Sequence, residues 1–322
     1  MKKHSIFLIM TLLLMLITGC ASTQQSIYDY AINIQRSRAD LEFKTIQVDG
    51  EQFAYLDREG DGETIVLLHG LTAEKDNWLD FVRYIPKGYR VLAIDLPGHG
   101  DNAQDMDKFY DPASLSCGLA RVLDELGIKR CHIAGNSLGG LISEIYASEH
   151  PDKVITLGLF DAAYLWAPTQ SEFQQAFING QNFFDVKTRS DYDRLIGFAF
   201  YDPPFMPWPI LSVASRKYIK RNSINMKIVG DGIQSDYYTS QEVYHEMMGT
   251  LSMPTFVIWG DKDRILDVSC VESFKCFLPH VEKVVILKDC GHVPMMERPE
   301  ESASHYAAFI KQYDLSSITD KN

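Results

Sequence analysis

The sequence is poor in basic residues and in cysteine. Its 322 residues include 31 Lys and Arg against 43 Asp and Glu, which gives a formal net charge of −12. Such an acidic chain is a poor candidate for binding nucleic acid or for electrostatic attachment to anionic lipid. The six cysteines form no Cys-x-x-Cys pair and no His/Cys cluster at zinc spacing, so the sequence gives no indication of a metal site.

Long hydrophobic runs are scarce as well, and the clearest one covers residues 6–17. It follows the basic opening Met1-Lys2-Lys3-His4 and ends at small residues, which is typical of a secretory signal peptide and short for a membrane span. We expect residues 1–19 to be removed on export. Their loss takes away two lysines and no acid, which changes the net charge from −12 to −14.

The end of this leader bears on the location of the protein. Leu16-Ile17-Thr18-Gly19-Cys20 resembles the bacterial lipobox, which implies cleavage before Cys20, lipidation of that cysteine and attachment to a membrane through acyl chains. By family analogy, Ala21 after the cysteine favours the bacterial outer membrane, on its periplasmic or cell-surface face. The alternative is an ordinary signal peptide cut nearby, with Cys20 incidental.

If Cys20 carries lipid, an odd number of cysteines remains, so at least one of them is unpaired. An exported compartment permits a disulfide, but the sequence does not choose the partners. Each of these residues can also be a small buried apolar side chain. The remaining cysteines are Cys117, Cys131, Cys270, Cys276 and Cys290.

Beyond the leader, short apolar runs alternate with helix-like stretches that are bounded by turn residues. This alternation predicts an α/β domain with a mostly parallel, doubly wound sheet of about eight strands. The first two strands form a hairpin around Asp49-Gly50, a favoured tight-turn pair. The expected strands lie at residues 43–48, 52–57, 64–68, 90–94, 131–134, 154–160, 255–259 and 284–287.

One interval breaks the alternation. Residues 162–253 hold no clean strand, only polar and aromatic segments around a proline-rich stretch, and we expect a helical cap inserted into the sheet domain. The aromatic and methionine residues of the cap suit its own core as well as a substrate. The sheet domain then comprises residues 41–161 and 254–316. Residues 20–40 before it are expected to form a polar tether followed by a short helix from residue 27.

The stretch Gly135-Asn136-Ser137-Leu138-Gly139-Gly140 lies between an apolar run and a helix-like run. Gly-x-Ser-x-Gly in that setting is typical of a nucleophile elbow, a turn too sharp for side chains at the flanking positions, which exposes the serine hydroxyl above the sheet. The motif predicts that Ser137 attacks a carbonyl carbon. On its own it is weak evidence, because small residues are frequent in turns.

A serine nucleophile needs a histidine base and an acid that orients the histidine, in the chain order Ser, acid, His. His292 lies in the loop after the last expected strand, and Asp261, Asp263 and Asp267 follow the strand before it. Both loops are at carboxyl ends of strands, the sheet edge where Ser137 is also expected. The spacing leaves the three aspartates open.

The oxyanion of a tetrahedral intermediate needs two backbone amides, which contribute roughly 3 kcal/mol each in acyl transfer. One is expected from Leu138, the residue after the nucleophile. The other is expected from Leu71, which follows His69-Gly70 in the loop after the third strand. We expect His69 to brace that loop.

Taken together these motifs resemble an α/β-hydrolase, from about residue 43 to the last helix. The Trp-Gly-x-x-Asp pattern of that family implies Asp263 as the acid, with Asp261 bracing the loop. Lys75-Asp76-Asn77-Trp78 is similar to the bacterial family V lipases and monoacylglycerol lipases. Many of these carry Phe where Leu71 stands, a change that keeps the amide donor but alters the acyl pocket. The motifs are His69-Gly70-Leu71, Asp95-Leu96-Pro97-Gly98-His99-Gly100, the elbow, Trp259-Gly260-Asp261-Lys262-Asp263 and Gly291-His292.

The residues and the resemblance predict a serine carboxylic-ester hydrolase, a lipase or esterase that cleaves small-molecule or lipid-derived acyl esters through an acyl-enzyme, without cofactor or metal. Ser137, Asp263 and His292 would form the catalytic triad. The alternatives are a triad hydrolase of another bond, such as a carbon–carbon hydrolase or a perhydrolase, and a tethered binding protein without turnover. Haloalkane dehalogenase chemistry needs Asp in place of Ser137. The oligomeric state stays open.

Overall fold

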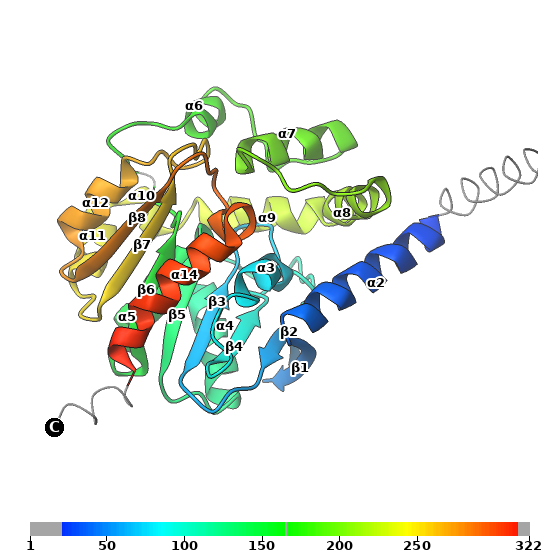
Figure 1. The fold of residues 1–322 in the computed structure, drawn as a ribbon. Helices are drawn as coiled ribbons and strands as arrows, with labels where there is room; N and C mark the ends of the chain where they lie inside the picture. Colours follow the sequence, from blue (N-terminus) through cyan, green and yellow to red (C-terminus); the bar gives the residue numbers. More distant parts are fainter. Residues whose placement is uncertain (1–20, 165, 315–322) are drawn as a thin grey trace, which may run out of the picture.

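The computed structural model describes residues 21–164 and 166–314. Its centre is one eight-stranded sheet in the order β1-β2-β4-β3-β5-β6-β7-β8 (Figure 1). β1, β2 and β4 pair antiparallel, and all other neighbours are parallel. The predicted fold class and all eight predicted strands are confirmed. The strands are β1 (Glu42–Val48), β2 (Glu51–Arg58), β3 (Thr64–Leu68), β4 (Arg90–Ile94), β5 (Cys131–Asn136), β6 (Val154–Phe160), β7 (Thr255–Gly260) and β8 (Val281–Leu287).

The two faces of the sheet are covered by different helices. Successive side chains of a strand point to opposite faces. In β3, Val66 and Leu68 therefore join one apolar core, while Ile65 and Leu67 join the other. The first core includes α4 (Pro112–Glu125) and α5 (Leu138–Glu149), and the second includes α3 (Leu79–Val82) and α14 (Pro299–Ile310). Figure 1 shows α3 and α14 in front of the sheet.

The described part of the sheet domain also contains five short helical segments. The longer helix α4 starts where the Asp111 side chain accepts a hydrogen bond from the Ser114 amide and Pro112 occupies the first turn. The five short segments are η1 (Lys75–Trp78), η2 (Pro151–Lys153), α12 (Cys270–Phe277), α13 (Pro294–Glu297) and η3 (Lys311–Tyr313).

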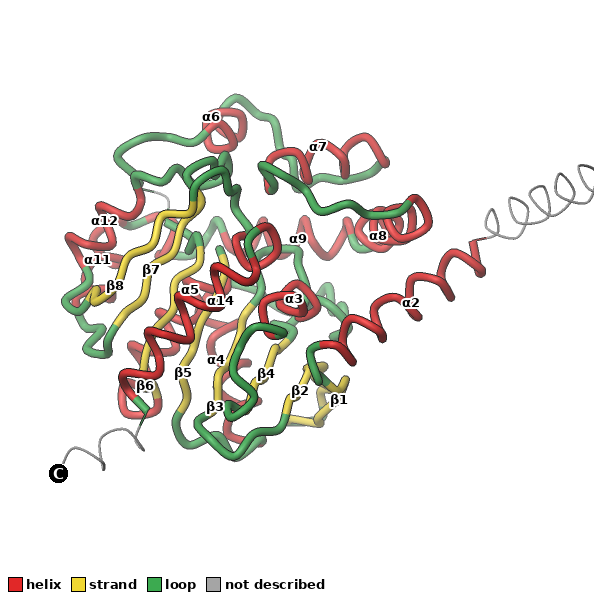
Figure 2. The backbone as a smooth tube through the Cα atoms, in the orientation of Figure 1, coloured by secondary structure: helices red, strands yellow, loops and turns green. Residues whose placement is uncertain are grey.

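The described residues between β6 and β7 form helices and loops and no strand. Figure 2 shows α6, α7 and α8 along the upper side of the sheet, whereas α11 contacts α5 and α12 at its flank. The helices of this interval are α6 (Glu172–Ile178), α7 (Arg189–Ala199), α8 (Trp208–Lys220), α9 (Asn222–Gly232), α10 (Asp236–Thr239) and α11 (Gln241–Gly249).

The N-terminal helix α2 (Ala21–Arg38) is longer than expected. The prediction of a polar tether before residue 27 is wrong for the described residues, because the helix already runs from Ala21. Packing against α8 explains the difference: Arg216 Nη1 donates to Gln24 Oε1 at 2.8 Å, and Lys217 Nζ lies 5.2 Å from the centre of the Tyr28 ring. None of the helices in the described ranges is long and apolar enough to cross a membrane. Cys20 lies outside the described residues.

Replacing Leu67 by Ala should lower the free energy of unfolding by about 2–5 kcal/mol, because a fully buried leucine leaves a cavity between the sheet and its covering helices. Urea unfolding followed by circular dichroism measures the change. Ile286→Ala on β8 is the control, since its side chain is 46% exposed and its loss should cost under about 1 kcal/mol. Equal losses in both variants would contradict this account of the core.

Candidate active site

Ser137 occupies the turn between β5 and α5 in a backbone conformation that side chains rarely adopt, with φ 54° and ψ −120°. The turn is possible because its neighbours are glycines: a Cβ at Gly135 would overlap the carbonyl oxygen of Gly139, and a Cβ at Gly139 would overlap that of Leu68. Such a conformation costs about 1–3 kcal/mol. Backbone hydrogen bonds hold it, including the one from the Ala163 amide to the Ser137 carbonyl at 2.9 Å.

Asp263 and His292 meet next to this turn. His292 Nδ1 lies 2.7 Å from Asp263 Oδ2, and both residues are buried. The other carboxylate oxygen, Oδ1, accepts hydrogen bonds from the amides of Ile265 at 2.8 Å and Leu266 at 2.9 Å. With both oxygens fixed, Asp263 accepts the Nδ1 proton of His292 and leaves Nε2 as the basic nitrogen of the ring.

The other two candidate aspartates have different partners. Asp261 pairs with Lys262 Nζ at 2.8 Å, and Asp267 accepts a hydrogen bond from the Ser269 amide at 2.9 Å, just before α12. Of the three aspartates that follow β7, Asp263 is the one bonded to His292.

The His292 loop is held by residues that the sequence did not single out. The His292 amide donates to the Ala199 carbonyl at the end of α7, at 2.8 Å. Asn136 Nδ2 donates to the His292 carbonyl at 2.9 Å, and the Glu297 carboxylate accepts from the Gly291 amide at 2.8 Å and the Asp202 amide at 2.8 Å. Asn136 could have been found from its place inside the elbow motif, whereas Glu297 carries no such signal.

The residues of the two expected oxyanion donors, Leu71 and Leu138, line the same cavity as Ser137. Leu138 is the first residue of α5, so its amide has no acceptor within the helix and lies at the positive end of the helix dipole. Leu71 precedes Thr72, whose φ is 62°. Thr72 Oγ1 donates to the Leu71 carbonyl at 2.6 Å and accepts from the Tyr218 hydroxyl at 2.5 Å, so α8 helps to fix the Leu71 loop.

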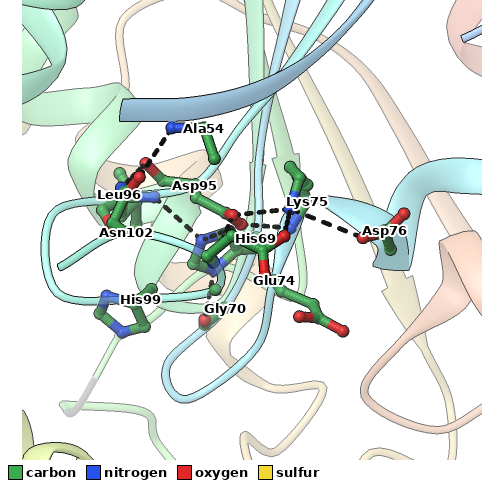
Figure 3. A network of polar contacts seen from close by, with 12 residues as sticks. Ala54, His69, Gly70, Glu74, Lys75, Asp76, Asp95, Leu96, His99 and Asn102 are labelled. Atoms are coloured by element: carbon green, nitrogen blue, oxygen red, sulfur yellow. Dashed lines mark hydrogen bonds and ion pairs between the residues drawn. The ribbon is translucent and has the colours of Figure 1, made fainter. Parts of the chain in front are cut away.

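His69 braces this loop from behind, as Figure 3 shows. Its Nε2 accepts a hydrogen bond from the Leu96 amide at 3.0 Å, and its Nδ1 therefore donates to the Gly70 carbonyl at 2.8 Å. Burial lowers the pKa of His69 to about 4, so the ring is neutral at ordinary pH. A neutral ring suits both bonds, because it has one donor and one acceptor.

Lys75 carries a buried charge beside His69 (Figure 3). Its Nζ lies 2.8 Å from Asp95 Oδ2 and 2.6 Å from Asp101 Oδ2. Burial alone would lower the pKa of Lys75, but the neighbouring carboxylates of Asp95, Asp76 and Asp101 outweigh it and raise the pKa. Asp76 is also bound by both Arg36 Nε and Nη2 at 2.7 Å, which connects α2 to this loop.

Two cavities meet at Ser137. The first, of about 320 Å³, reaches His292 and the side chains of Tyr28, Lys217 and Arg221. The second, of about 300 Å³, has no charged side chain in its wall and is lined mainly by apolar residues, several of them from α6 and α9. Both include Leu71, so the predicted nucleophile and oxyanion loop lie where the cavities join.

Two groups of side chains bring potential metal-binding atoms within 4.8 Å of one another: Asp161 with Asp263 and His292, and Glu63 with His132 and Asp314. Asp263 and His292 use these atoms to bond each other, and His132 bonds Glu63 at 2.8 Å through Nε2. The named atoms of Asp263, His292 and His132 are thus engaged in hydrogen bonds within the protein. Chemistry without a metal stays a prediction.

The cysteines of the described part are free thiols, and three of them, Cys131, Cys270 and Cys290, are buried. Burial raises the pKa of each of these thiols. They fill the core as small neutral side chains.

Residues 63–299 match the family model of the alpha/beta hydrolase fold, and the chain belongs to this family. Its relatives include Lipase 1 of Psychrobacter immobilis, which is 31% identical over 291 residues that make up 89% of each chain. Monoacylglycerol lipase abhd6-B of Xenopus laevis is 27% identical over 286 residues, 85% of this chain and 84% of that protein. The predicted resemblance to lipases and monoacylglycerol lipases is confirmed.

Among solved structures, a membrane phospholipase A described as a bacterial virulence factor is similar over 97% of this chain and 99% of that chain. Its TM-score is 0.86 and its sequence identity 33%.

Replacing Lys75 by Met should lower the free energy of unfolding by about 3–5 kcal/mol, because Asp95 would keep a buried charge without its cation. Thermal or urea unfolding measures the loss. Lys153→Met, which removes the surface pair with Asp124, is the matched control and should stay within about 1 kcal/mol of the unchanged protein. A Lys75→Met protein as stable as that control would refute the role of the buried pair.

Proposed function

We propose that this protein is a serine hydrolase of carboxylic esters, with Ser137 as nucleophile, His292 as general base and acid, and Asp263 as the residue that orients His292. The observation that carries the proposal is the 2.7 Å contact between His292 Nδ1 and Asp263 Oδ2 in a cavity wall shared by His292 and Ser137. The lipase relatives support hydrolysis of an ester bond.

The proposed reaction follows from this arrangement. Ser137 Oγ attacks the ester carbonyl carbon while His292 Nε2 takes the hydroxyl proton, and Asp263 stabilises the imidazolium that forms. The amides of Leu71 and Leu138 donate to the oxyanion. The intermediate collapses as His292 returns the proton to the leaving alcohol, and a water activated by His292 then hydrolyses the acyl-enzyme. These steps use no cofactor or metal.

The two cavities suggest how a lipid ester would lie. We assign the acyl chain to the second cavity, because its wall has no charged side chain and includes Phe173, Phe177 and Ile228. Each buried methylene contributes about 0.8 kcal/mol to binding. The alcohol part would occupy the first cavity, whose wall includes the charged residues Glu74, Lys217 and Arg221. The substrate is thus an acyl ester of a lipid.

We also propose that lipidated Cys20 attaches the protein to a membrane, with the bacterial outer membrane as the destination. The Gly19-Cys20 pair at the end of the apolar run supports this attachment. α2 begins at the next residue, and its Tyr28 and Ile32 line the first cavity. A lipid surface at the start of α2 would therefore lie close to the helix that forms part of the substrate cavity.

Ser137→Ala should lower kcat for p-nitrophenyl esters by a factor on the order of 10⁶, as expected when a triad nucleophile is lost, and should abolish labelling by a fluorophosphonate probe. Ser148→Ala is the control, because Ser148 lies on α5, the helix that follows Ser137, and its hydroxyl bonds only the Ile145 carbonyl among its described contacts. Activity in the Ser137→Ala protein equal to that of the control would reject the mechanism. Labelling of Ser137 with cleavage of diketones and no cleavage of esters would favour a carbon–carbon hydrolase.

Gly232→Leu should shift activity toward shorter acyl chains, because Gly232 lines the second cavity and a Cβ there first meets Tyr238 at 3.8 Å. Rates on esters of increasing chain length measure the shift. Gly230→Leu is the matched control two residues earlier, where a Cβ meets no atom within 4 Å. The same chain-length profile in both variants would contradict the assignment of the acyl chain to the second cavity.

A further inference from the structure

Asp161 directly follows β6, and one of its carboxyl oxygens lies within 4.8 Å of Asp263 and His292. Its side chain is fully buried, and its φ is 42°. Its amide donates to the Ile258 carbonyl at 3.0 Å, and its Oδ1 accepts from the Gly260 amide at 3.0 Å. Its second oxygen, Oδ2, is buried and finds no hydrogen-bond donor among the described residues. A buried carboxylate oxygen without a donor is costly.

The surroundings of Asp161 disfavour a second negative charge. Burial, followed by the nearby charge and hydrogen bonding of Asp263 and then by Glu297, raises the pKa of Asp161 well above its usual value. Carboxyl oxygens of Asp161 and Asp263 and a ring nitrogen of His292 all lie within 4.8 Å of one another. The charge of Asp161 is also among the causes that raise the pKa of the buried thiols of Cys270 and Cys290.

The two oxygens of Asp263 are already engaged as acceptors, by His292 and by the Ile265 and Leu266 amides. Each carboxylate oxygen of Asp263 can accept a second hydrogen bond, and a protonated Asp161 Oδ2 would be the donor. The same proton removes the unpaired acceptor on Asp161 and avoids two adjacent buried charges. Carboxyl groups in this position share one proton because they cannot both ionise at low cost.

We propose that Asp161 is a positioning residue that stays protonated and donates a hydrogen bond from Oδ2 to Asp263, so that the pair carries a single negative charge toward His292. The inference rests on the proposed function, because it assigns Asp161 a role in keeping Asp263 directed at the catalytic histidine. The proton stays on the pair through the reaction, and Asp161 does not touch the substrate.

The single negative charge proposed for the Asp161–Asp263 pair can be tested directly with Asp161→Asn. Asparagine keeps an acceptor for the Gly260 amide and a donor for Asp263 without any negative charge. If Asp161 is neutral in the unchanged protein, the acid limb of the kcat/KM pH profile, which reports protonation of the free enzyme's base, should move by less than about 0.3 pH unit. A shift of the limb to lower pH by about 1 unit or more would mean that asparagine had removed a negative charge, and would overturn the proposal.

Asp161→Leu removes the donor as well as the acid. It should lower kcat by about 10- to 100-fold, as for a lost hydrogen bond to a charged group, with KM within about twofold because no substrate contact changes. Asp161→Asn should restore kcat. Equal kcat losses in the two variants would overturn the proposal, since they would show that the acid, and not the donor, is needed.

Infrared spectroscopy of the folded Asp161→Asn protein gives a second readout that does not depend on the leucine variant. The stretching band of a protonated buried carboxyl should be present in the unchanged protein and missing in Asp161→Asn. Burial raises the pKa of Glu144 to about 8, so its band at neutral pH should remain in both. An unchanged spectrum would overturn the proposal. Activity without Ser137 would instead reject the proposed function, whatever the state of Asp161.

Discussion

The close contact of backbone with backbone at the turn after β5 is the constraint on which the site depends. A Cβ at Gly135 would overlap the backbone of Gly139, and a Cβ at Gly139 would overlap the backbone of Leu68 and His69. The absence of side chains at both positions allows α5 to begin immediately after the strand. Ser137 takes the strained position between them. Ser137 and Leu138, the first residue of α5, therefore line the same cavity.

The helices above the sheet are bonded directly to the groups around Ser137. The Tyr218 hydroxyl holds Thr72 beside Leu71, and the His292 amide bonds the last residue of α7, Ala199. The amide of Asp202, between α7 and α8, bonds Glu297. Any movement that opens the cavities by lifting α7 or α8 must break or carry along these bonds. Opening of the cavities and the geometry of the candidate site are thus coupled through a few polar contacts.

Much of the fold could be predicted from the sequence, because apolar runs bounded by turn residues specify buried strands. The motifs that follow these runs lie at the carboxyl ends of the strands, which predicts the sheet edge where the site lies. The choice of Asp263 needed the family pattern, because three aspartates follow β7 and only the hydrogen bond to His292 separates them. Glu297 and Asp161 could not be predicted. Their roles depend on contacts between segments far apart in the chain, such as Asp161 with Gly260. The helix at residues 21–26 was missed because its contact with α8, through Gln24 and Arg216, joins segments far apart in the chain.

The contacts of α2 bear on how a shortened form of this protein would behave. A version that begins after Arg38 would lose the wall that Tyr28 and Ile32 give the first cavity and would leave Asp76 without its arginine partner. Arg216 and Lys217 on α8 would lose their contacts with Gln24 and Tyr28. Such a shortened form would therefore have a more open and differently charged cavity. Substrate preferences measured on it would not apply to the full-length chain.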